Sequence, residues 1–403
     1  MGEITRTSND SGMNALVPGA WSPSGPGWGT QPAWLSTSTG PKDSTIQHRV
    51  DVLVIGAGQA GLAAAHELHR AGMRGFADGV DITGTYLVID AEVRPGGAWQ
   101  HRWPTLTMET VNDIADLPGL KVGEHNPTDL ASHVVPEYFT RYEEHFDFPI
   151  MRPVFVYSVE RHEGQYLVKT SGGTWLARAI INCTGTWTRP FVPYYPGQQS
   201  FRGIQLHTQD YRGPNQFTRR RVAVVGGGIS ATQHLAELAP VAKSTAWYTR
   251  REPNWIDSGG KLKTGMQVEE AVRARVEAGL RPLSVVAATG LLVTDSVRAA
   301  REAGVFNRKP MFKAVEPDGV QQANGRLWKA DIILWATGFR SELRHLAPLK
   351  LRTSDGGIMM KGTAVAGEPT IQLIGYGPTA STIGARWGAR KAVRELKSIL
   401  KIS

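Results

Sequence analysis

The feature that most constrains the fold is a glycine-rich turn between a strand-like and a helix-like segment. Residues 50–72 read VDVLVIGAGQAGLAAAHELHRAG, and Gly56, Gly58 and Gly61 follow the apolar run with G-x-G-x-x-G spacing. The first glycine permits a tight turn, the second removes a side chain where a pyrophosphate approaches the backbone, and the third lets helix and strand pack closely. The phosphate then faces the helix N-terminus. The pattern predicts a dinucleotide-binding strand–turn–helix unit.

An acidic residue stands where such a unit holds the ribose. Residues 86–90, YLVID, predict the next strand, and Asp90 at its end has a carboxylate that can accept hydrogen bonds from a ribose diol. Asp90 comes later than the usual spacing of about 20 residues after the turn. The excess falls in 73–84, MRGFADGVDITG, which we interpret as a loop insertion.

The same pattern occurs a second time in residues 221–240, RVAVVGGGISATQHLAELAP. Here Gly226, Gly228 and Ala231 give G-x-G-x-x-A. Gly226, Gly228 and Ser230 are the expected contacts to a second nucleotide, at the start of the second predicted helix. Two such units in one chain predict two nucleotide sites, or one site and a degenerate copy.

The end of the next predicted strand distinguishes NADPH from NADH. Residues 244–250, STAWYTR, end in Arg250, and Arg251 follows. An NAD site places an acid here, whereas arginine offers a planar fork that pairs with a 2′-phosphate. Glu252 lies past both arginines. We therefore expect NADPH, and the alternative is that both arginines are only surface charges.

Composition narrows the class of protein. The 403 residues are 41% hydrophobic and 20% charged, which is typical of a globular chain of two or three domains. The single cysteine, Cys183, excludes an internal disulfide and a CxxC redox pair, and fits a reducing, cytoplasmic location. No apolar run reaches about 18 residues and no signal peptide is evident, so we expect no membrane association. The net charge of +9 is not accompanied by a nucleic-acid-binding motif, so we expect no nucleic acid partner.

A second glycine motif follows the ribose acid. Residues 95–100 read PGGAWQ, with Gly96, Gly97 and Trp99 soon after Asp90. This arrangement resembles the class B flavin-dependent monooxygenases, in which an acid-x5-GG-x-W pattern follows the second strand. The resemblance implies that the first site holds FAD, with Asp90, Gly97, Trp99 and Gln100 among its contacts. It spans roughly residues 50 to 395 and implies no metal ion.

The segment before the second glycine turn carries the most specific part of the resemblance. Residues 201–211, FRGIQLHTQDY, match the family fingerprint F-x-G-x-x-x-H-x-x-x-aromatic through Phe201, Gly203, His207 and Tyr211. Glycine lets the backbone pass close to a neighbouring loop, and histidine can form hydrogen bonds through both ring nitrogens. We interpret His207 as a structural clasp at the domain junction, and a proton-transferring role is the alternative.

Two segments ending in Thr-Gly, 179–185 and 331–338, bracket the second unit. They predict an α/β fold with two Rossmann-like dinucleotide-binding domains, the NADPH domain being inserted into the FAD domain. Thr184 at the first crossing is an expected FAD contact. The predicted divisions are an irregular arm at 1–46, an FAD domain at 47–195 and 331–403, and an NADPH domain at 196–330 with the linking motif 201–211.

The resemblance also implies a chemistry. NADPH reduces FAD, the reduced flavin forms a C4a-(hydro)peroxide with O₂, and a small organic substrate is oxygenated. Tyr211 stands where Baeyer–Villiger enzymes usually carry Trp, which favours oxygenation at N or S. Heteroatom-oxidising members often carry an Asn after the GG-x-W motif, and here the first Asn of that stretch is Asn112. The alternatives are a Baeyer–Villiger enzyme, an NADPH oxidase or electron-transfer reductase, and a non-catalytic nucleotide sensor. The oligomeric state is left open, and a homodimer is the one assembly considered.

Overall fold

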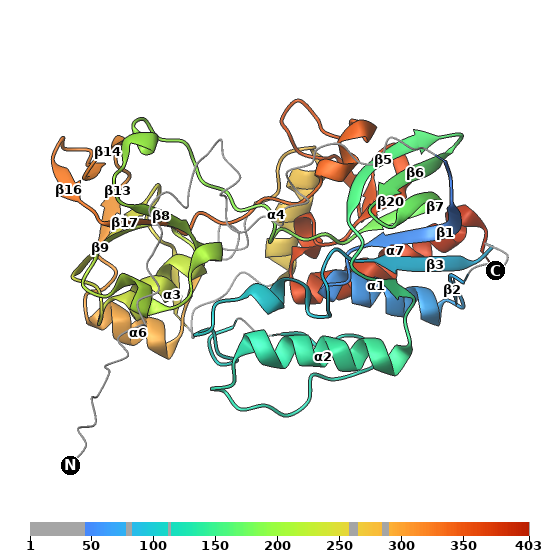
Figure 1. The fold of residues 1–403 in the computed structure, drawn as a ribbon, viewed down its shortest axis with the longest axis horizontal. Coiled ribbons are helices and arrows are strands. Elements are labelled where there is room, and N and C mark those ends of the chain that lie inside the picture. Colours follow the sequence, from blue (N-terminus) through green and yellow to red (C-terminus); the bar gives the residue numbers. More distant parts are fainter. Residues whose placement is uncertain (1–44, 78–82, 112–113, 258–264, 284–289, 403) are drawn as a thin grey trace, which may run out of the picture.

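The computed structural model describes residues 45–402 apart from 78–82, 112–113, 258–264 and 284–289. The predicted N-terminal arm, 1–46, lies outside the described residues except for its last two. The described chain forms two α/β units that lie side by side (Figure 1). Among the described residues, no helix combines the length and the apolar character needed to cross a membrane.

The first unit is built on a largely parallel sheet with β1 (His48–Ile55) at its centre. β1 pairs in parallel with β3 (Thr85–Ile89) on one side and with β7 (Gly173–Asn182) on the other. The sheet order is β18-β19-β20-β7-β1-β3-β2. The further strands are β2 (Arg74–Gly75), β4 (Ile150–Met151), β5 (Val156–His162), β6 (Gln165–Thr170), β18 (Met360–Lys361), β19 (Ala364–Val365) and β20 (Glu368–Leu373).

Both faces of this sheet are covered, which explains why its strands read as continuous apolar runs. Alternate residues of β1 point to opposite faces, so Val52 and Val54 enter one core cluster while Leu53 and Ile55 enter another. The first cluster lies under the helices α1 (Gln59–Arg70), α2 (Ala131–Phe146) and α7 (Thr382–Leu400). The last helix of the chain thus packs beside the first, as the colours of Figure 1 show.

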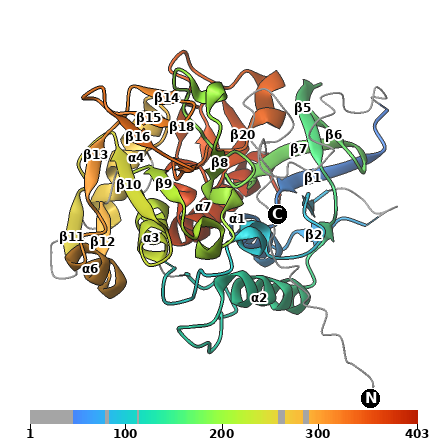
Figure 2. The ribbon, with the colours of Figure 1, turned by 60° about the vertical axis from the view of Figure 1, so that its left-hand side comes forward.

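The second unit contains a fully parallel sheet in the order β13-β10-β9-β17-β8. Its helix α3 (Ile229–Leu238) follows β9 directly. Figure 2 shows the sheets of both units from another side. The strands are β8 (Ile204–His207), β9 (Arg221–Val225), β10 (Ser244–Thr249), β13 (Arg308–Pro310) and β17 (Ile332–Trp335). Smaller elements complete it, namely β11 (Trp255–Asp257), β12 (Leu291–Val293), α6 (Asp295–Glu302), β14 (Ala314–Glu316), β15 (Gly319–Gln321) and β16 (Leu327–Lys329). The helix α4 (Gly265–Glu277) belongs to the same stretch of the chain but packs against the first unit, where Val276 joins the core cluster of Leu53 and Ile55.

The second sheet is inserted between two strands of the first, as the sequence predicts. The chain leaves the first sheet after β7 and returns to it at β18 to β20. The expected return at residue 331 is wrong, because β17 pairs with β9 and β8 of the second sheet. Asp331 accepts hydrogen bonds from the backbone and guanidinium nitrogens of Arg221, which fixes the starts of β17 and β9 side by side. The return therefore follows Trp335.

The expected loop insertion at 73–84 is only partly irregular. Arg74–Gly75 forms β2 and pairs in parallel with β3, while residues 78–82 lie outside the described part.

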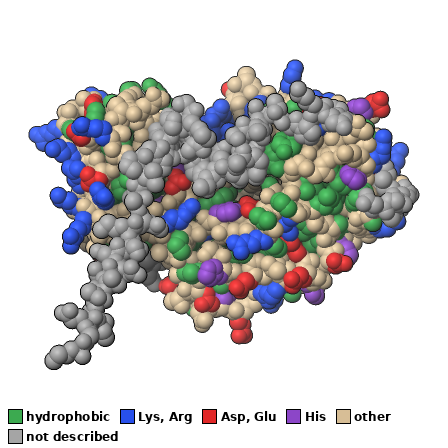
Figure 3. Space-filling view, in the orientation of Figure 1, with side chains coloured by type: hydrophobic (Ala, Val, Ile, Leu, Met, Phe, Trp, Pro, Cys, Tyr) green, Lys and Arg blue, Asp and Glu red, His purple; other side chains and the backbone are tan. Residues whose placement is uncertain are grey.

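On the opposite side of the molecule, Lys and Arg side chains lie along the outer edge of the second unit, beside β16 and α6 (Figure 3). This edge accounts for part of the net charge of +9.

Candidate functional site

The first glycine turn joins β1 to α1 and leaves space beside its middle glycine. Gly56 has a φ of +99°, and a Cβ atom there would lie 2.7 Å from the carbonyl oxygen of Cys183. A Cβ atom on Gly61 would lie 1.8 Å from the carbonyl oxygen of Gly56. These two glycines are thus required by packing. In contrast, a Cβ atom on Gly58 would meet only the Cα atom of Gly97, at 4.0 Å, so Gly58 leaves room for a ligand.

The start of α1 offers backbone N–H groups to that space. Gly58 is the N-cap residue, and no side chain caps the helix. The first N–H groups of a helix have no partner within the helix, and they favour an anion such as a phosphate. The turn therefore fits the pyrophosphate of a dinucleotide.

The GG-x-W loop lies directly against this turn. A Cβ atom on Gly97 would lie 3.0 Å from the Cα atom of Gly58, so the two loops contact each other through bare backbone. Gln100 closes its own loop, because its Nε2 donates to the carbonyl oxygens of Arg94 (3.1 Å) and Gly97 (3.3 Å). Trp99, in the 3-10 helix η2 (Gly97–His101), packs against core clusters of both units. This loop is placed to cover a ligand bound at the first turn.

Asp90 lies at the end of β3, as expected for a ribose acid, but a protein cation already contacts it. Arg152 Nε donates to Asp90 Oδ2 (3.1 Å), and the other guanidinium nitrogens of Arg152 form two hydrogen bonds to Glu143 (2.6 and 2.7 Å). Burial raises the pKa of Asp90, and Arg152 opposes that rise. The carboxylate is therefore oriented by Arg152, a partner that no local sequence pattern indicates.

The second glycine turn repeats the first at the start of α3. Gly228 is the N-cap residue without a side-chain cap, and a Cβ atom there would meet nothing within 4 Å. A Cβ atom on Gly226 would lie 2.1 Å from the carbonyl oxygen of Ala336, so this glycine is required by packing. Ser230 lies half-buried in the first turn of α3, while Ala231 is buried in the third glycine position. This second turn also fits a phosphate group.

Arg250 and Arg251 are exposed at the end of β10, where a 2′-phosphate would lie. Within the described part of the chain neither guanidinium has an ion-pair partner. Glu252 instead pairs with Arg308, whose Nε also donates to Thr249 Oγ1 (2.9 Å). Because Arg308 holds the carboxylate, Glu252 is not paired with the two arginines.

Three of the fingerprint residues of the linking segment pack inside the second unit. Phe201 is buried in the core of the second sheet, and a Cβ atom on Gly203 would lie 2.4 Å from the carbonyl oxygen of Asp331. Tyr211 is fully buried, and its hydroxyl donates to Glu237 Oε2 of α3 (2.7 Å). The segment therefore packs against both β17 and α3.

His207 uses both ring nitrogens within the protein. Its Nε2 lies 3.0 Å from the carbonyl oxygen of Gly338, and its Nδ1 accepts from the backbone N–H of Gln209 (3.1 Å). These contacts require the neutral tautomer with hydrogen on Nε2. Burial lowers the pKa of His207 to about 4. This geometry favours the interpretation of His207 as a clasp between β8 and the segment after β17.

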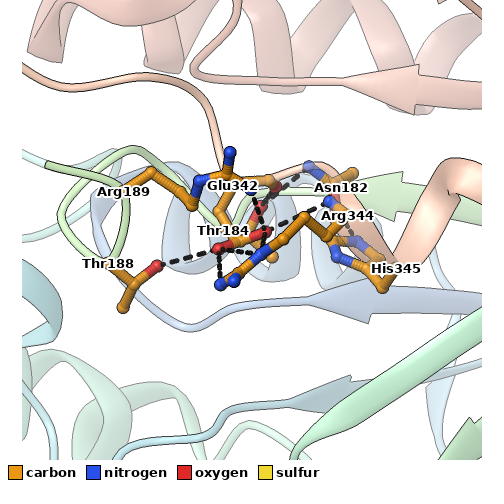
Figure 4. A network of polar contacts seen from close by, with 7 residues as sticks. All are labelled: Asn182, Thr184, Thr188, Arg189, Glu342, Arg344 and His345. Atoms are coloured by element: carbon orange, nitrogen blue, oxygen red, sulfur yellow. Dashed lines mark hydrogen bonds and ion pairs between the residues drawn. The ribbon is translucent and has the colours of Figure 1, made fainter. Parts of the chain in front are cut away.

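Thr184 lies at the crossing between the units, and its hydroxyl is engaged there (Figure 4). Thr184 Oγ1 donates to the carbonyl oxygen of Glu342 (2.5 Å) and accepts from Asn182 Nδ2 (3.0 Å). Asn182 Oδ1 lies 2.6 Å from Nε2 of the buried His345, and Arg344 forms charged hydrogen bonds to Glu342. The network ties the end of β7 to the segment returning from the second unit. A contact of Thr184 with FAD remains a prediction.

The carboxyl ends of both sheets meet at this junction. Trp187, just after β7, stacks on Phe339, just after β17, with ring centroids 5.0 Å apart. Phe339 also contacts the His207 ring edge-on (4.9 Å), and Gln209 Nε2 donates to the carbonyl oxygen of Trp187 (3.2 Å). Ligands of parallel α/β sheets bind beyond the carboxyl ends of the strands. The only local signal for these aromatics is their position just after the two Thr-Gly pairs.

Two further expectations concern residues near the first turn. Cys183 is buried beneath the turn, and burial raises the pKa of its thiol, so it is not placed as a redox nucleophile. Asn112 lies outside the described residues. Throughout the described ranges, no group of three or more His, Cys, Asp or Glu side chains is arranged to hold a metal ion.

Comparison with known proteins agrees with this geometry. The model of the pyridine nucleotide-disulphide oxidoreductase family matches residues 53–362. A solved flavin-containing monooxygenase from Stenotrophomonas maltophilia is 34% identical, with a TM-score of 0.72, over 88% of this chain and 99% of that chain. Indole-3-pyruvate monooxygenase YUCCA1 of Oryza sativa subsp. japonica is 27% identical over 327 residues, which are 72% of this chain and 77% of the relative.

A cyclohexanone monooxygenase structure shares the fold at a lower level of identity. It is 18% identical with a TM-score of 0.60, over 88% of this chain and 87% of that chain. The family match, the extent of the flavin-containing monooxygenase match and the two glycine turns lead to one conclusion. The chain belongs to the pyridine nucleotide-disulphide oxidoreductase family and, within it, is a class B flavin-dependent monooxygenase, an oxidoreductase that uses FAD and NADPH.

Proposed function

We propose that the chain oxygenates a nitrogen or sulfur atom of a small organic molecule, with FAD at the first glycine turn and NADPH at the second. One observation carries this proposal. Each turn opens an uncapped helix beside a glycine that leaves space for a ligand, and both turns follow strands whose carboxyl ends face the same junction. Two dinucleotides held in this way would bring their reactive rings together between the units.

The first unit would hold FAD mainly through backbone. The N–H groups at the start of α1 would bind the pyrophosphate, and Gly58 and Gly97 would let it approach. Asp90, oriented by Arg152, would accept hydrogen bonds from the ribose. Gln100 would act indirectly, because its amide holds the loop that carries Trp99.

The second unit would hold NADPH in the corresponding way. Gly226, Gly228 and Ser230 would form the phosphate site at the start of α3, and the exposed guanidinium groups of Arg250 and Arg251 would bind the 2′-phosphate. When bound, the two cofactors would supply hydride transfer and the activation of O₂. The protein's part is to orient the two ligands and to exclude water, and the stacked Trp187 and Phe339 form an apolar wall for that purpose.

Two observations support oxygenation at N or S over Baeyer–Villiger insertion. The linking segment ends in Tyr211, whose hydroxyl is tied to Glu237, where Baeyer–Villiger enzymes usually carry Trp. The sequence identity to a flavin-containing monooxygenase is 34%, whereas the sequence identity to cyclohexanone monooxygenase is 18%. The proposal includes O₂ and a small molecule as the partners, and a cytoplasmic location in keeping with the single cysteine.

The experiment measures how much of the NADPH consumed leads to oxygenated product rather than to hydrogen peroxide. Purified FAD-loaded protein is mixed with NADPH and O₂ in the presence of methyl phenyl sulfide, N,N-dimethylaniline or cyclohexanone, and NADPH consumed, product and hydrogen peroxide are counted. We expect sulfoxide or N-oxide with little peroxide. Lactone from cyclohexanone as the main product would contradict the N or S assignment. Stoichiometric peroxide with all three substrates would instead indicate an NADPH oxidase.

A further inference from the structure

Arg102 is a charged side chain at the junction that none of the functions above employs. It directly follows η2, and its guanidinium carbon lies over two indole rings, 5.2 Å from the centroid of Trp99 and 4.7 Å from that of Trp187. Cations are attracted to the faces of indole rings at such distances. The two tryptophans therefore hold the guanidinium group in place.

The guanidinium has no charge partner in the described part of the chain. Its Nε is buried without a hydrogen-bond partner, and no described carboxylate lies within ion-pair distance. Burial lowers the pKa of Arg102 to about 10, so the group stays protonated at neutral pH. Arg102 as a whole is partly buried. A protonated guanidinium whose buried N–H lacks an acceptor is unfavourable, whereas a bound anion would satisfy it.

The position of Arg102 connects it to the reaction rather than to a remote surface. Trp99 belongs to the loop that contacts the first glycine turn, and Trp187 stacks on Phe339 beyond the carboxyl end of β17. The guanidinium therefore lies between the end of the first sheet and the end of the second. The phosphate sites of the two cofactors are already provided by uncapped helix starts.

We propose that Arg102 is a substrate-binding residue that receives a carboxylate, and that Trp99 and Trp187 provide the aromatic walls beside it. This inference rests on the proposed function, and it narrows the substrate to small aromatic or apolar molecules that carry a carboxylate. A planar guanidinium matches a carboxylate through two parallel hydrogen bonds, which a lysine ammonium does not reproduce. The site thus selects anionic over neutral analogues of the same shape.

The test compares phenylacetate with phenylacetamide, which have similar shapes but differ in charge. Binding to FAD-loaded wild-type protein, R102Q and R102K is followed through tryptophan fluorescence and flavin absorbance. We expect phenylacetate to bind wild type at least tenfold more tightly than phenylacetamide, R102Q to lose this preference, and R102K to keep part of it. R301Q is the matched control, since Arg301 also lies over an indole, that of Trp255, at 5.5 Å, and is itself exposed.

Several results would overturn the proposal. Equal Kd values of the two probes for wild type would show that no carboxylate is selected. An unchanged preference in R102Q would assign the selection to another residue. Loss of FAD or of NADPH affinity in R102Q, with the probe preference intact, would show that the anion is a cofactor phosphate. If R102Q does not fold, the wild-type preference and its reduction in R102K decide the matter.

Different results would contradict the proposed function and the role of Arg102. Protein that binds no FAD, or whose flavin NADPH does not reduce, would contradict the proposed function before any probe is added. Protein that is FAD-loaded and NADPH-reducible, but indifferent to the charge of the probe, would contradict only the role of Arg102.

Discussion

Replacing the middle glycine of each turn with alanine tests the two nucleotide sites independently. Gly58 has φ −79° and Gly228 has φ −103°, which are backbone conformations that alanine adopts without strain. A Cβ atom would meet nothing closer than 4.0 Å at Gly58 and nothing within 4 Å at Gly228. We therefore expect G58A and G228A to fold like the wild type, while each methyl group lies in the path of a bound pyrophosphate.

The size of the effect follows from the contacts that the methyl group would displace. A hydrogen bond from a backbone N–H to a charged phosphate contributes about 1.5–3 kcal/mol. Losing one such bond raises the Kd by roughly 10- to 150-fold, at about 1.4 kcal/mol for each factor of ten. G58A is expected to show this loss for FAD, and G228A to show it for NADPH with FAD content unchanged.

The assay titrates FAD into apoprotein and NADP⁺ into FAD-loaded protein, with thermal unfolding of each apoprotein as the control for folding. G61A is the contrasting variant, because its Cβ would lie 1.8 Å from the carbonyl oxygen of Gly56 and the turn itself must deform. A wild-type Kd for FAD in folded G58A would refute the assignment of the first turn. Weakening of the same ligand by G58A and by G228A would refute the separation of the two sites.

Three further predictions concern the second unit and the junction. R250A should raise the Kd of NADPH by tenfold or more and leave that of NADH nearly unchanged, as equilibrium titration would show; equal changes would remove Arg250 from the 2′-phosphate site. R308M should free Glu252 to approach that site and weaken NADPH binding, and the double variant R308M/E252Q should restore it; a double variant as weak as R308M would contradict this account. The pKa of His207 is lowered to about 4 by burial, so the unfolded chain binds the proton more readily between pH 6.5 and 4. Stability is therefore lost as the pH falls through that range, by up to roughly 3 kcal/mol for this group. H207Q, measured by chemical denaturation, should lose less stability over the same range than wild type, and identical pH profiles would contradict the prediction.

The parts of the fold and site that the sequence predicts are those set by neighbouring residues. Each glycine turn depends on contacts within the turn or with the adjacent strand, as the short distance from Gly61 to Gly56 shows. The linking segment is likewise a local pattern, and His207 and Tyr211 find partners that fit the structural interpretation. Such features are visible in the order of residues alone.

The parts that the sequence does not predict depend on partners far along the chain. Residues 179–185 and 331–338 look alike, yet β17 lies in the second sheet, where it pairs with β9 and where Asp331 pairs with Arg221. The cation beside Asp90 is Arg152, and Arg308 withdraws Glu252 from the second site. None of these pairings follows from composition or periodicity, since each joins segments that only the tertiary fold brings together.

The most direct test of the central claim is a two-step mixing experiment. FAD-loaded protein is reduced with NADPH without oxygen and then mixed with oxygenated buffer, while flavin absorbance and hydrogen peroxide are followed together. The monooxygenase account predicts a long-lived absorbance state that differs from both oxidised and reduced flavin, with peroxide released slowly unless a substrate is oxygenated. Immediate return of the oxidised flavin spectrum with stoichiometric peroxide, with or without substrate, would contradict it.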